Sequence, residues 1–173
     1  MGFDFRFRLV TNRKDLTNLV NFLIKQSLGY PCYEDWVQRA EAEIEGGYKT
    51  AILGFSNDYL VADLIFQQHK ELPNVREVKN IRVHPDFRRR DFAHFMLRQA
   101  EAESPNYQAI ICDVRADRPE AIMLLRFSGY VPIVSVPLYD KKVSDVVMIK
   151  CFDKATESGL TYRSKQIILG KAV

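Results

Sequence analysis

Hydrophobic and polar residues alternate along the first segment of the chain, where Phe3, Phe5, Phe7 and Leu9 are separated by charged residues. Because successive side chains of a strand point to opposite faces, this pattern predicts a half-buried β-strand over residues 3–10. Later runs rich in aromatic and β-branched residues, bounded by turn residues, predict further strands. These runs cover residues 48–55, 59–67, 75–83, 107–114, 131–138 and 143–152.

Other segments repeat their apolar residues every three or four positions, which is typical of amphipathic helices. They predict helices over residues 12–28, 33–45, 91–103 and 119–128. Asn12 is a favourable N-cap for the first of these helices, and Gly29 and Gly46 follow the ends of the first two. The resulting order of elements is βααβββαβαββ.

This order predicts an α/β fold with a mixed sheet. A strand, helix, strand unit in the middle of the chain requires at least one parallel pair of strands, whereas the hairpins around it supply antiparallel pairs. We therefore expect one mixed sheet with helices on both faces. The sequence has no internal repeat, so we expect a single domain over residues 1–152 and a C-terminal extension over residues 153–173. Whether the extension packs on its own domain or on a partner subunit stays open.

Composition narrows the class of protein. Of 173 residues, 47% are hydrophobic and 27% are charged, as in a globular domain of ordinary size, and the net charge of +3 is too small to indicate nucleic-acid binding. The three cysteines form no CxxC pair and the three histidines lack metal-binding spacing, so we expect free thiols, a structural Cys112 and no metal. No apolar run is long enough to span a membrane and the first residues lack a secretory signal, so we expect a cytoplasmic protein without membrane association.

The stretch VHPDFRRRDFA, residues 83–93, places Arg88, Arg89 and Arg90 where a predicted strand passes into a predicted helix. Helix N-termini present unpaired N–H groups and a partial positive charge, so this junction is a natural anion site. Several N–H groups and cations on a short arc suit a diphosphate better than a monophosphate. The alternative is a solvated basic turn that binds nothing; the position at the junction, and Pro85 fixing the turn, favour the anion site.

The block VKNIRVHPDFRRRDFAHFMLRQA resembles the acetyl-CoA-binding core of the GNAT family of acyltransferases, and RPEAIMLLRFSGYVPI resembles the second motif of that family. The resemblance covers about residues 3–152 and implies a GNAT-like acyl-CoA N-acyltransferase fold with acetyl-CoA as the acyl donor. It implies that a strand edge pairs with the pantetheine arm and that loop N–H groups hold the diphosphate. The residues implied are Ile81, Arg82, Val83, Arg88, Arg89, Arg90, Asp91, Phe92 and Ala93.

The sequence departs from the family pattern at three positions. Asp91 replaces the first loop glycine, and its carboxylate either caps the helix or, turned inward, repels the diphosphate. Arg118 stands at the position of a frequent asparagine. Leu125 stands at the position of a frequent tyrosine that, in the family, protonates the departing thiolate, and leucine cannot donate a proton.

The resemblance also implies direct attack of an amine on the thioester, so no covalent nucleophile is required. Glu77, six residues before Val83, is the candidate base that removes the amine proton. A main-chain N–H near Val83 would meet the oxyanion. The proton for the thiolate would come from water or from a hydroxyl group of Ser128, Tyr130 or Tyr139.

The sequence therefore predicts an N-acetyltransferase that acts on a primary amine of a small molecule or a protein. Its expected partners are a CoA thioester and an amine acceptor, and a homodimer is left open. The alternative, suggested by Leu125 and Asp91, is a weak or inactive member of the same fold that binds acyl-CoA or a regulatory partner. A nucleic-acid-binding role has less support, because the aromatic residues interleaved with the arginines are limited to Phe87 and Phe92.

Overall fold

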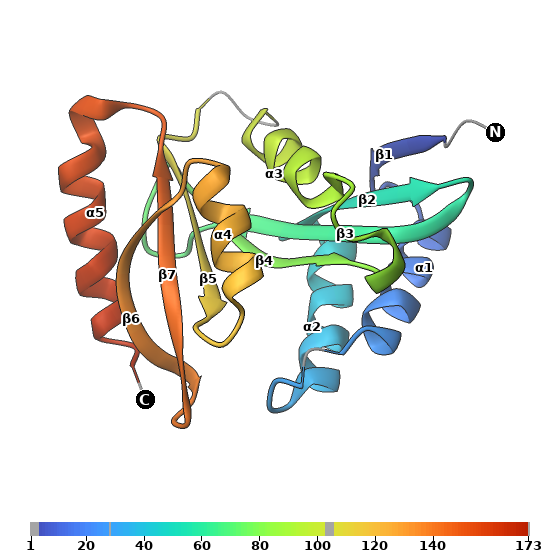
Figure 1. Ribbon diagram of the computed structural model, residues 1–173, viewed down its shortest axis with the longest axis horizontal. Coiled ribbons are helices and arrows are strands. Elements are labelled where there is room, and N and C mark those ends of the chain that lie inside the picture. The colour runs from blue at the N-terminus through green and yellow to red at the C-terminus, as the bar shows by residue number, and fades with distance from the viewer. Residues whose placement is uncertain (1–3, 28, 103–105, 173) are drawn as a thin grey trace. The chain divides into compact units, whose positions relative to one another are not determined.

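The computed structural model describes residues 4–27, 29–102 and 106–172 (Figure 1). Its elements follow the order β1 (Phe5–Leu9), α1 (Arg13–Lys25), α2 (Tyr33–Glu45), β2 (Thr50–Ser56), β3 (Tyr59–Gln68), β4 (Val75–Val83), a 3-10 helix (Pro85–Phe87), α3 (Phe92–Ala102), β5 (Ala109–Arg115), α4 (Pro119–Phe127), β6 (Val131–Asp140), β7 (Val143–Cys151) and α5 (Lys154–Leu169). The predicted order of strands and α-helices is confirmed, and α5 is an additional helix. Phe3, Leu28 and Glu103, at the limits of three predicted elements, lie outside the described residues.

The strands form a mixed sheet in the order β1-β2-β3-β4-β5-β7-β6. Strands β4 and β5 are parallel, whereas β1–β2, β2–β3, β5–β7 and β6–β7 are antiparallel. The predicted mixed α/β fold class is therefore confirmed.

Local sequence features explain several element boundaries. The Asn12 side chain accepts the N–H of Asp15 at 2.9 Å and caps α1 as predicted. Between β2 and β3, Asn57 and Asp58 have φ values of 47° and 68°, a left-handed pair that suits a two-residue hairpin turn. Pro119 occupies the first position of α4, where its missing N–H removes no helical hydrogen bond.

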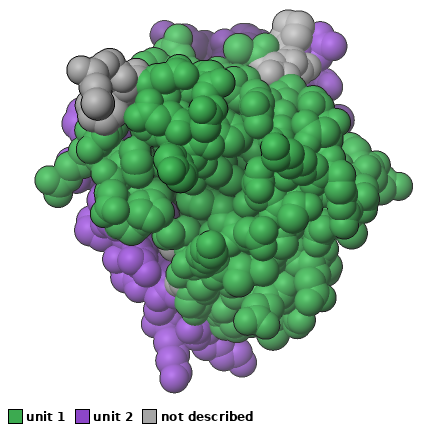
Figure 2. Space-filling view, turned by 90° about the vertical axis from the view of Figure 1, so that its right-hand side faces the viewer, with its two compact units in different colours: residues 1–67, 79–103 green, residues 68–78, 104–173 purple. Residues whose placement is uncertain are grey.

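The chain divides into two compact units, which Figure 2 colours separately. Unit 1 comprises residues 1–67 and 79–103, and unit 2 comprises residues 68–78 and 104–173. Strand β4 contributes to both units, since residues 75–78 belong to unit 2 and residues 79–83 to unit 1.

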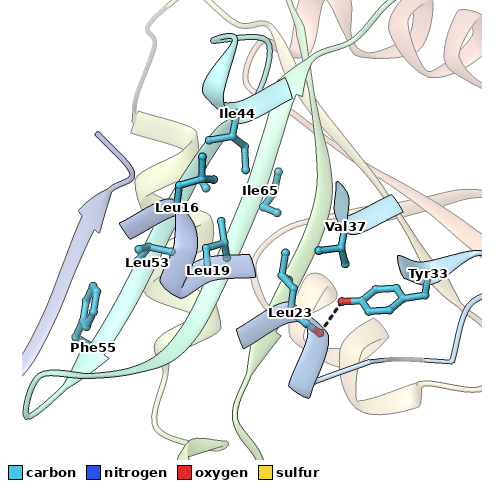
Figure 3. Packing of buried hydrophobic residues seen from close by; sticks show 10 residues of the cluster. Leu16, Leu19, Leu23, Tyr33, Val37, Ile44, Leu53, Phe55 and Ile65 are labelled. Atoms are coloured by element: carbon cyan, nitrogen blue, oxygen red, sulfur yellow. Dashed lines mark hydrogen bonds between the residues drawn. The ribbon is translucent and has the colours of Figure 1, made fainter. Parts of the chain in front are cut away.

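The core of unit 1 lies between helices α1 and α2 and one face of β2 and β3 (Figure 3). Its buried members are Leu16, Leu19, Leu23, Tyr33, Val37, Ile44, Ala51, Leu53, Phe55 and Ile65. The Tyr33 hydroxyl donates to the main-chain oxygen of Leu23 at 2.9 Å, so the start of α2 is bonded to the last turns of α1. This cluster fixes the two N-terminal helices on the sheet.

The opposite face of β2 receives the start of α3 at Gly54. A Cβ added to Gly54 would lie 3.0 Å from Ala62 Cβ and 3.1 Å from a ring atom of Phe92, the first residue of α3. The missing side chain therefore sets how closely the first turn of α3 approaches the sheet. Helices thus cover both faces of the sheet within unit 1, as predicted.

The core of unit 2 lies between helix α5 and the strands β5, β6 and β7. Its buried members are Leu72, Val75, Ala109, Ile111, Val136, Val147, Ile149, Leu160 and Ile168. Leu160 and Ile168 belong to α5, so this helix packs on strands of its own unit. The sequence left open whether the C-terminal extension packs on its own domain or on a partner subunit, and the structure shows packing on its own strands. Among the described residues, no helix has the length and apolar character needed to cross a bilayer.

We predict that Gly54→Ala destabilises the protein by about 1–3 kcal/mol, because the new methyl group meets Ala62 and Phe92 in a filled core. Urea denaturation measures the effect. The matched control is Gly159→Ala in α5, where an added Cβ has no atom within 4 Å and a helical alanine should stabilise by about 0.5–1 kcal/mol. Equal stability of the Gly54→Ala variant and the parent protein would contradict the tight packing of α3.

Candidate functional site

The loop between β4 and α3 alternates the sign of its backbone φ angles. Arg88 has φ −65°, Arg89 has φ 61° and Asp91 has φ 60°, whereas Arg90 between them is outside the left-handed region. Neighbouring residues of opposite φ sign turn successive N–H groups toward a common point in anion-binding concavities, and here only Arg89–Asp91 can contribute, because Arg88 is extended with ψ 159°. The predicted phosphate loop thus contains two left-handed residues, Arg89 and Asp91, directly before α3.

Helix α3 begins directly after this concavity. The first helical hydrogen bond runs from the N–H of Phe95 to the main-chain oxygen of Asp91 at 2.9 Å. The N–H groups of the preceding first turn have no intrahelical acceptor and carry the positive end of the helix dipole. The side chains of Arg88, Arg89 and Arg90 are exposed and add full positive charges to the same segment.

Two loop residues have roles that the sequence did not show. The N–H of Arg88 donates to the Pro85 carbonyl at 3.3 Å, so it belongs to the 3-10 turn, and Arg88 Nε donates to the Val83 carbonyl at 3.3 Å. Asp91 has a positive φ, whereas residues that cap a helix through their side chains are extended. Glycine adopts a positive φ most easily, which is the physical reason for the family's glycine at this position.

Aromatic side chains pack around the loop and fix its position. Phe92 is 2% exposed, and its ring centroid lies 4.9 Å from that of Phe5, 5.6 Å from that of Phe7 and 6.4 Å from that of Phe87. The Arg90 guanidinium lies over the Phe87 ring, 5.2 Å from its centroid. The Phe92 side chain is therefore structural, and its main chain is the part left for a ligand.

The Arg82 side chain points away from the predicted cosubstrate and into the core of unit 1. It is 7% exposed, and its Nη1 donates to the main-chain oxygens of Leu23, at 3.3 Å, and Gln26, at 2.5 Å. It also donates to the Tyr33 hydroxyl and lies 4.8 Å from the centroid of that ring. Arg82 thus satisfies carbonyl groups at the end of α1, and only its main chain remains available for the predicted strand edge.

Arg82 has a buried acidic neighbour in Asp63 of β3. The Asp63 side chain is fully buried and accepts a hydrogen bond from Asn80 Nδ2, while Arg82 Nε donates to Asn80 Oδ1 at 3.1 Å. Burial raises the pKa of Asp63 to about 7, although the Arg82 charge and the Asn80 hydrogen bond act in the opposite direction. The group therefore titrates near neutral pH.

Ile81 and Val83 alternate with Arg82 along β4 and are half-buried. The described ladder between β4 and β5 joins residues 75–78 to residues 109–112, and the predicted strand edge at residues 81–83 follows it along β4. After Val83, the N–H of His84 donates to the Val61 carbonyl of β3 at 2.7 Å. The main chain of β4 is thus fixed by β3 immediately before the loop.

In unit 2, Glu77 lies on the same face of the sheet as Asp113 and Asp145. Glu77 is in register with Ile111, two residues before Asp113, and Asp113 is in register with Val147, two residues after Asp145. Side chains two residues apart on a strand share a face, so the three carboxylates project from one side of neighbouring strands.

Tyr139 joins this acidic group, which brings together two of the predicted catalytic residues. Its hydroxyl forms a hydrogen bond with the Asp113 side chain and lies within the electrostatic reach of Glu77 and Asp145. Burial of the hydroxyl raises the Tyr139 pKa, and the neighbouring carboxylates raise it further, although the residue as a whole is 46% exposed. Tyr139 is consequently a neutral phenol at physiological pH.

Tyr130, the third predicted catalytic residue, lies at the other end of β6. Val131 pairs with Ile149, Ile149 with Ile111 and Ile111 with Glu77, so these residues share one face of the sheet, and Tyr130, one residue before Val131, points to the opposite face. Tyr130 is 2% exposed, and Lys150 Nζ lies 5.8 Å from its ring centroid. The structure therefore does not bring Tyr130 to the group around Glu77.

Three further residues are buried near the start of β6 or within β5. Leu125 is 4% exposed and its carbonyl accepts the Tyr130 N–H at 3.0 Å, while Ser128 is also buried. Cys112 is buried, which raises its thiol pKa well above the usual range and makes it a structural residue, as predicted. Within the described segments, no three His, Cys, Asp or Glu side chains are placed to hold a metal ion.

A model of the acetyltransferase (GNAT) family matches residues 17–130, which is more than half of the chain. The chain belongs to the GNAT family. The matched region contains the alternating loop, α3 and Glu77, so the sequence resemblance and the predicted GNAT fold are confirmed. A search of curated proteins found no match for this GNAT chain.

Solved GNAT structures share the fold at low sequence identity. An acetyltransferase of the GNAT family from Streptococcus pneumoniae has a TM-score of 0.67 at 16% identity, covering 87% of this chain and 100% of its own. The spermidine N-acetyltransferase of Vibrio cholerae has a TM-score of 0.66 at 14% identity, covering 85% and 93%. The ribosomal-protein-S18-alanine N-acetyltransferase of Escherichia coli has a TM-score of 0.67 at 17% identity, covering 86% and 95%.

Sequence reasoning missed Asp63, Asp113 and Asp145. Each lies in a β-rich run whose apolar neighbours dominate the pattern, and each gains its partners from another strand or helix. The available signal was a lone carboxylate in an otherwise apolar strand, which is rarely buried without a specific partner.

We predict that the free energy of unfolding of this GNAT chain falls as pH rises from 4 to 7, through Asp63. The folded protein keeps Asp63 protonated up to its pKa of about 7, whereas the unfolded chain ionises near the ordinary value of 3.8. The stabilisation is thus complete below about pH 4 and lost as pH passes 7, by an amount on the order of 4 kcal/mol.

Chemical denaturation across this pH range, compared between the parent protein and Asp63→Asn, measures this contribution, because asparagine mimics the protonated carboxyl. Asp86→Asn, the same change at an exposed side chain, controls for the loss of one carboxylate. Parallel curves for the parent and the Asp63→Asn variant would contradict the prediction.

Proposed function

We propose that this GNAT chain transfers an acetyl group from acetyl-CoA to a primary amine of a small molecule or a protein. The observation that carries the proposal is the alternating backbone of Arg89–Arg90–Asp91 at the start of α3. This concavity suits the diphosphate of a CoA thioester, because N–H groups, a helix dipole and exposed arginines act on the same segment. The family match supports the same cosubstrate.

The proposed reaction is direct attack without a covalent enzyme intermediate. The amine nitrogen forms a bond to the thioester carbonyl carbon, the carbon–sulfur bond breaks, and Glu77 takes the proton that the amine loses. A main-chain N–H near Val83 stabilises the oxyanion. Cys112 takes no part, because its buried thiol stays protonated. The leaving thiolate takes its proton from water or from the Tyr139 hydroxyl.

A weak or inactive acyl-CoA-binding protein is the second candidate. It is favoured by Leu125, which is buried at the position where the family often has its proton-donating tyrosine. The two candidates share the phosphate loop and differ in whether Glu77 has a catalytic effect.

The proposed class of acceptor amines is not narrowed to the acceptor of any one structural neighbour. By their names, two of the neighbours act on spermidine and on an alanine of ribosomal protein S18, and at 14% and 17% identity they support the fold alone. We place the protein in the cytoplasm, a proposal supported by its three free cysteines.

We predict that Asp91→Gly binds acetyl-CoA about two- to fivefold more tightly than the parent protein, because it removes a negative charge and the cost of a positive φ from the phosphate loop. Isothermal titration calorimetry measures the dissociation constant. Asp91→Asn is the matched control, since asparagine tolerates the same backbone and removes only the charge. Weaker binding by Asp91→Gly would contradict the loop geometry, and no binding by any of the three proteins would overturn the proposed function.

We predict that Glu77→Gln lowers kcat about 100-fold or more and leaves the affinity for acetyl-CoA unchanged, because glutamine cannot accept the amine proton. Thiol release from acetyl-CoA in the presence of a panel of primary amines measures the rate. Glu120→Gln, at an exposed position in the first turn of α4, is the control and keeps the parent rate. Bound acetyl-CoA without turnover in the parent protein would select the second candidate.

A further inference from the structure

The sheet face that carries Glu77 also carries two carboxylates that the proposed transfer does not use. Asp113 on β5 and Asp145 on β7 are diagonal neighbours, which places their backbone positions about 7–8 Å apart. The Tyr139 hydroxyl forms a hydrogen bond with the Asp113 side chain, and the charge of Asp145 also acts on it. A phenol and two carboxylates are thus collected within one small area of unit 2.

Asp145 has an unused acceptor in this area. The residue is 1% exposed; its Oδ2 accepts the N–H of Leu138 at 3.1 Å, at the irregular end of β6, and its carboxylate also accepts a main-chain hydrogen bond from Tyr139. Its Oδ1 is buried and, in the part of the chain that the structure describes, has no hydrogen-bond partner. A buried carboxylate oxygen without a donor is unfavourable, so a donor from a ligand would stabilise it.

Arg115, in register with Asp145, is a cation close to this group. Arg115 acts electrostatically on Asp145, but its Nε and Nη2 are bonded to the two carboxylate oxygens of Asp117 at 3.0 and 2.6 Å. Glu77 adds a further negative charge to the group. The carboxylates of Glu77, Asp113 and Asp145 thus all act on the Tyr139 hydroxyl.

The chemistry of this group suits an organic ammonium ion. The carboxylates are not arranged to hold a metal ion among the described residues. An ammonium group carries three donors, which match the Asp113 carboxylate, Asp145 Oδ1 and the lone pairs of the Tyr139 oxygen. Its charge would also relieve the repulsion between the two carboxylates.

We propose that Asp113, Asp145 and Tyr139 bind a non-reacting ammonium group of the acceptor, so that the preferred acceptor is a diamine or a longer polyamine. This inference rests on the proposed amine acetyltransferase function. The reacting nitrogen must be neutral to attack, whereas a group of carboxylates holds a bound amine in its protonated form. The subsite therefore suits the second charge of the acceptor, and Glu77 on the neighbouring strand is left for the reacting nitrogen.

The test compares three amines of one chain length: 1,4-diaminobutane, 1-aminobutane and 4-aminobutanoate. Calorimetry on the full chain should give a dissociation constant at least tenfold lower for the diamine than for the other two. Asp113→Asn should weaken diamine binding about tenfold and aminobutane binding less than twofold, because it removes a charged partner of the second nitrogen. Glu120→Gln, an exposed carboxylate of the same unit, should change neither constant by more than twofold.

A thermal melt establishes that Asp113→Asn is folded, and Tyr139→Phe, which removes only the hydroxyl, provides a second variant with a smaller loss of diamine affinity. Equal binding of the three amines, or diamine binding unchanged in both variants, would overturn the subsite. Acetylation without a preference for the diamine would leave the proposed function intact and reject the subsite. Asp113-dependent diamine binding without acetyl transfer would support the subsite and count against the proposed function.

Discussion

The buried guanidinium of Arg82 is the interaction on which the arrangement of unit 1 depends. It offers hydrogen bonds to carbonyl groups at the end of α1 and to Tyr33 of α2, and it supplies positive charge near the buried Asp63. Removing it would leave helix carbonyls without a donor and, above the Asp63 pKa of about 7, a buried carboxylate without a counter-charge. Side chains alternate along β4, so Ile81 and Val83 point to the sheet face opposite that of Arg82. The strand then leads directly into the proposed phosphate loop.

The loop itself holds a backbone that its sequence does not favour. Arg89 and Asp91 both adopt left-handed conformations without being glycine, and such residues cost on the order of 1–3 kcal/mol each. Packing offsets this strain. Phe92 is surrounded by Phe5, Phe7 and Phe87 and lies against Gly54, so the residue after Asp91 is fixed in place before any ligand arrives. A preformed loop of this kind loses little entropy when an anion binds.

The elements of the fold could be predicted because their signals are local. Periods of two and of three to four residues, together with Asn12, Asn57 and Pro119, give the order of strands and helices. Helix α5 escaped prediction because its inward positions, Leu160, Ser164 and Ile168, include a serine and so form a weak apolar stripe.

The candidate site was only partly accessible from the sequence. The proposed phosphate loop is contiguous in the sequence, so its motif could be recognised. The inward direction of Arg82 and the grouping of Glu77, Asp113 and Tyr139 arise from strand register, which links residues far apart in the chain.

The proton balance of the reaction explains why Tyr139 is better suited to binding than to donating a proton. Burial and three nearby carboxylates raise its pKa above the ordinary tyrosine value of 10.0, whereas a simple thiol has a pKa of about 8.5. Transfer from this phenol to the leaving thiolate is therefore unfavourable by more than one pKa unit, or more than about 1.4 kcal/mol. Leu125 offers no donor, so the thiolate takes its proton from bulk solvent, whose pH of about 7 lies below the pKa of about 8.5 of a simple thiol. The Tyr139 hydroxyl then keeps its proton for Asp113, and its oxygen lone pairs are left to accept from a bound ammonium group.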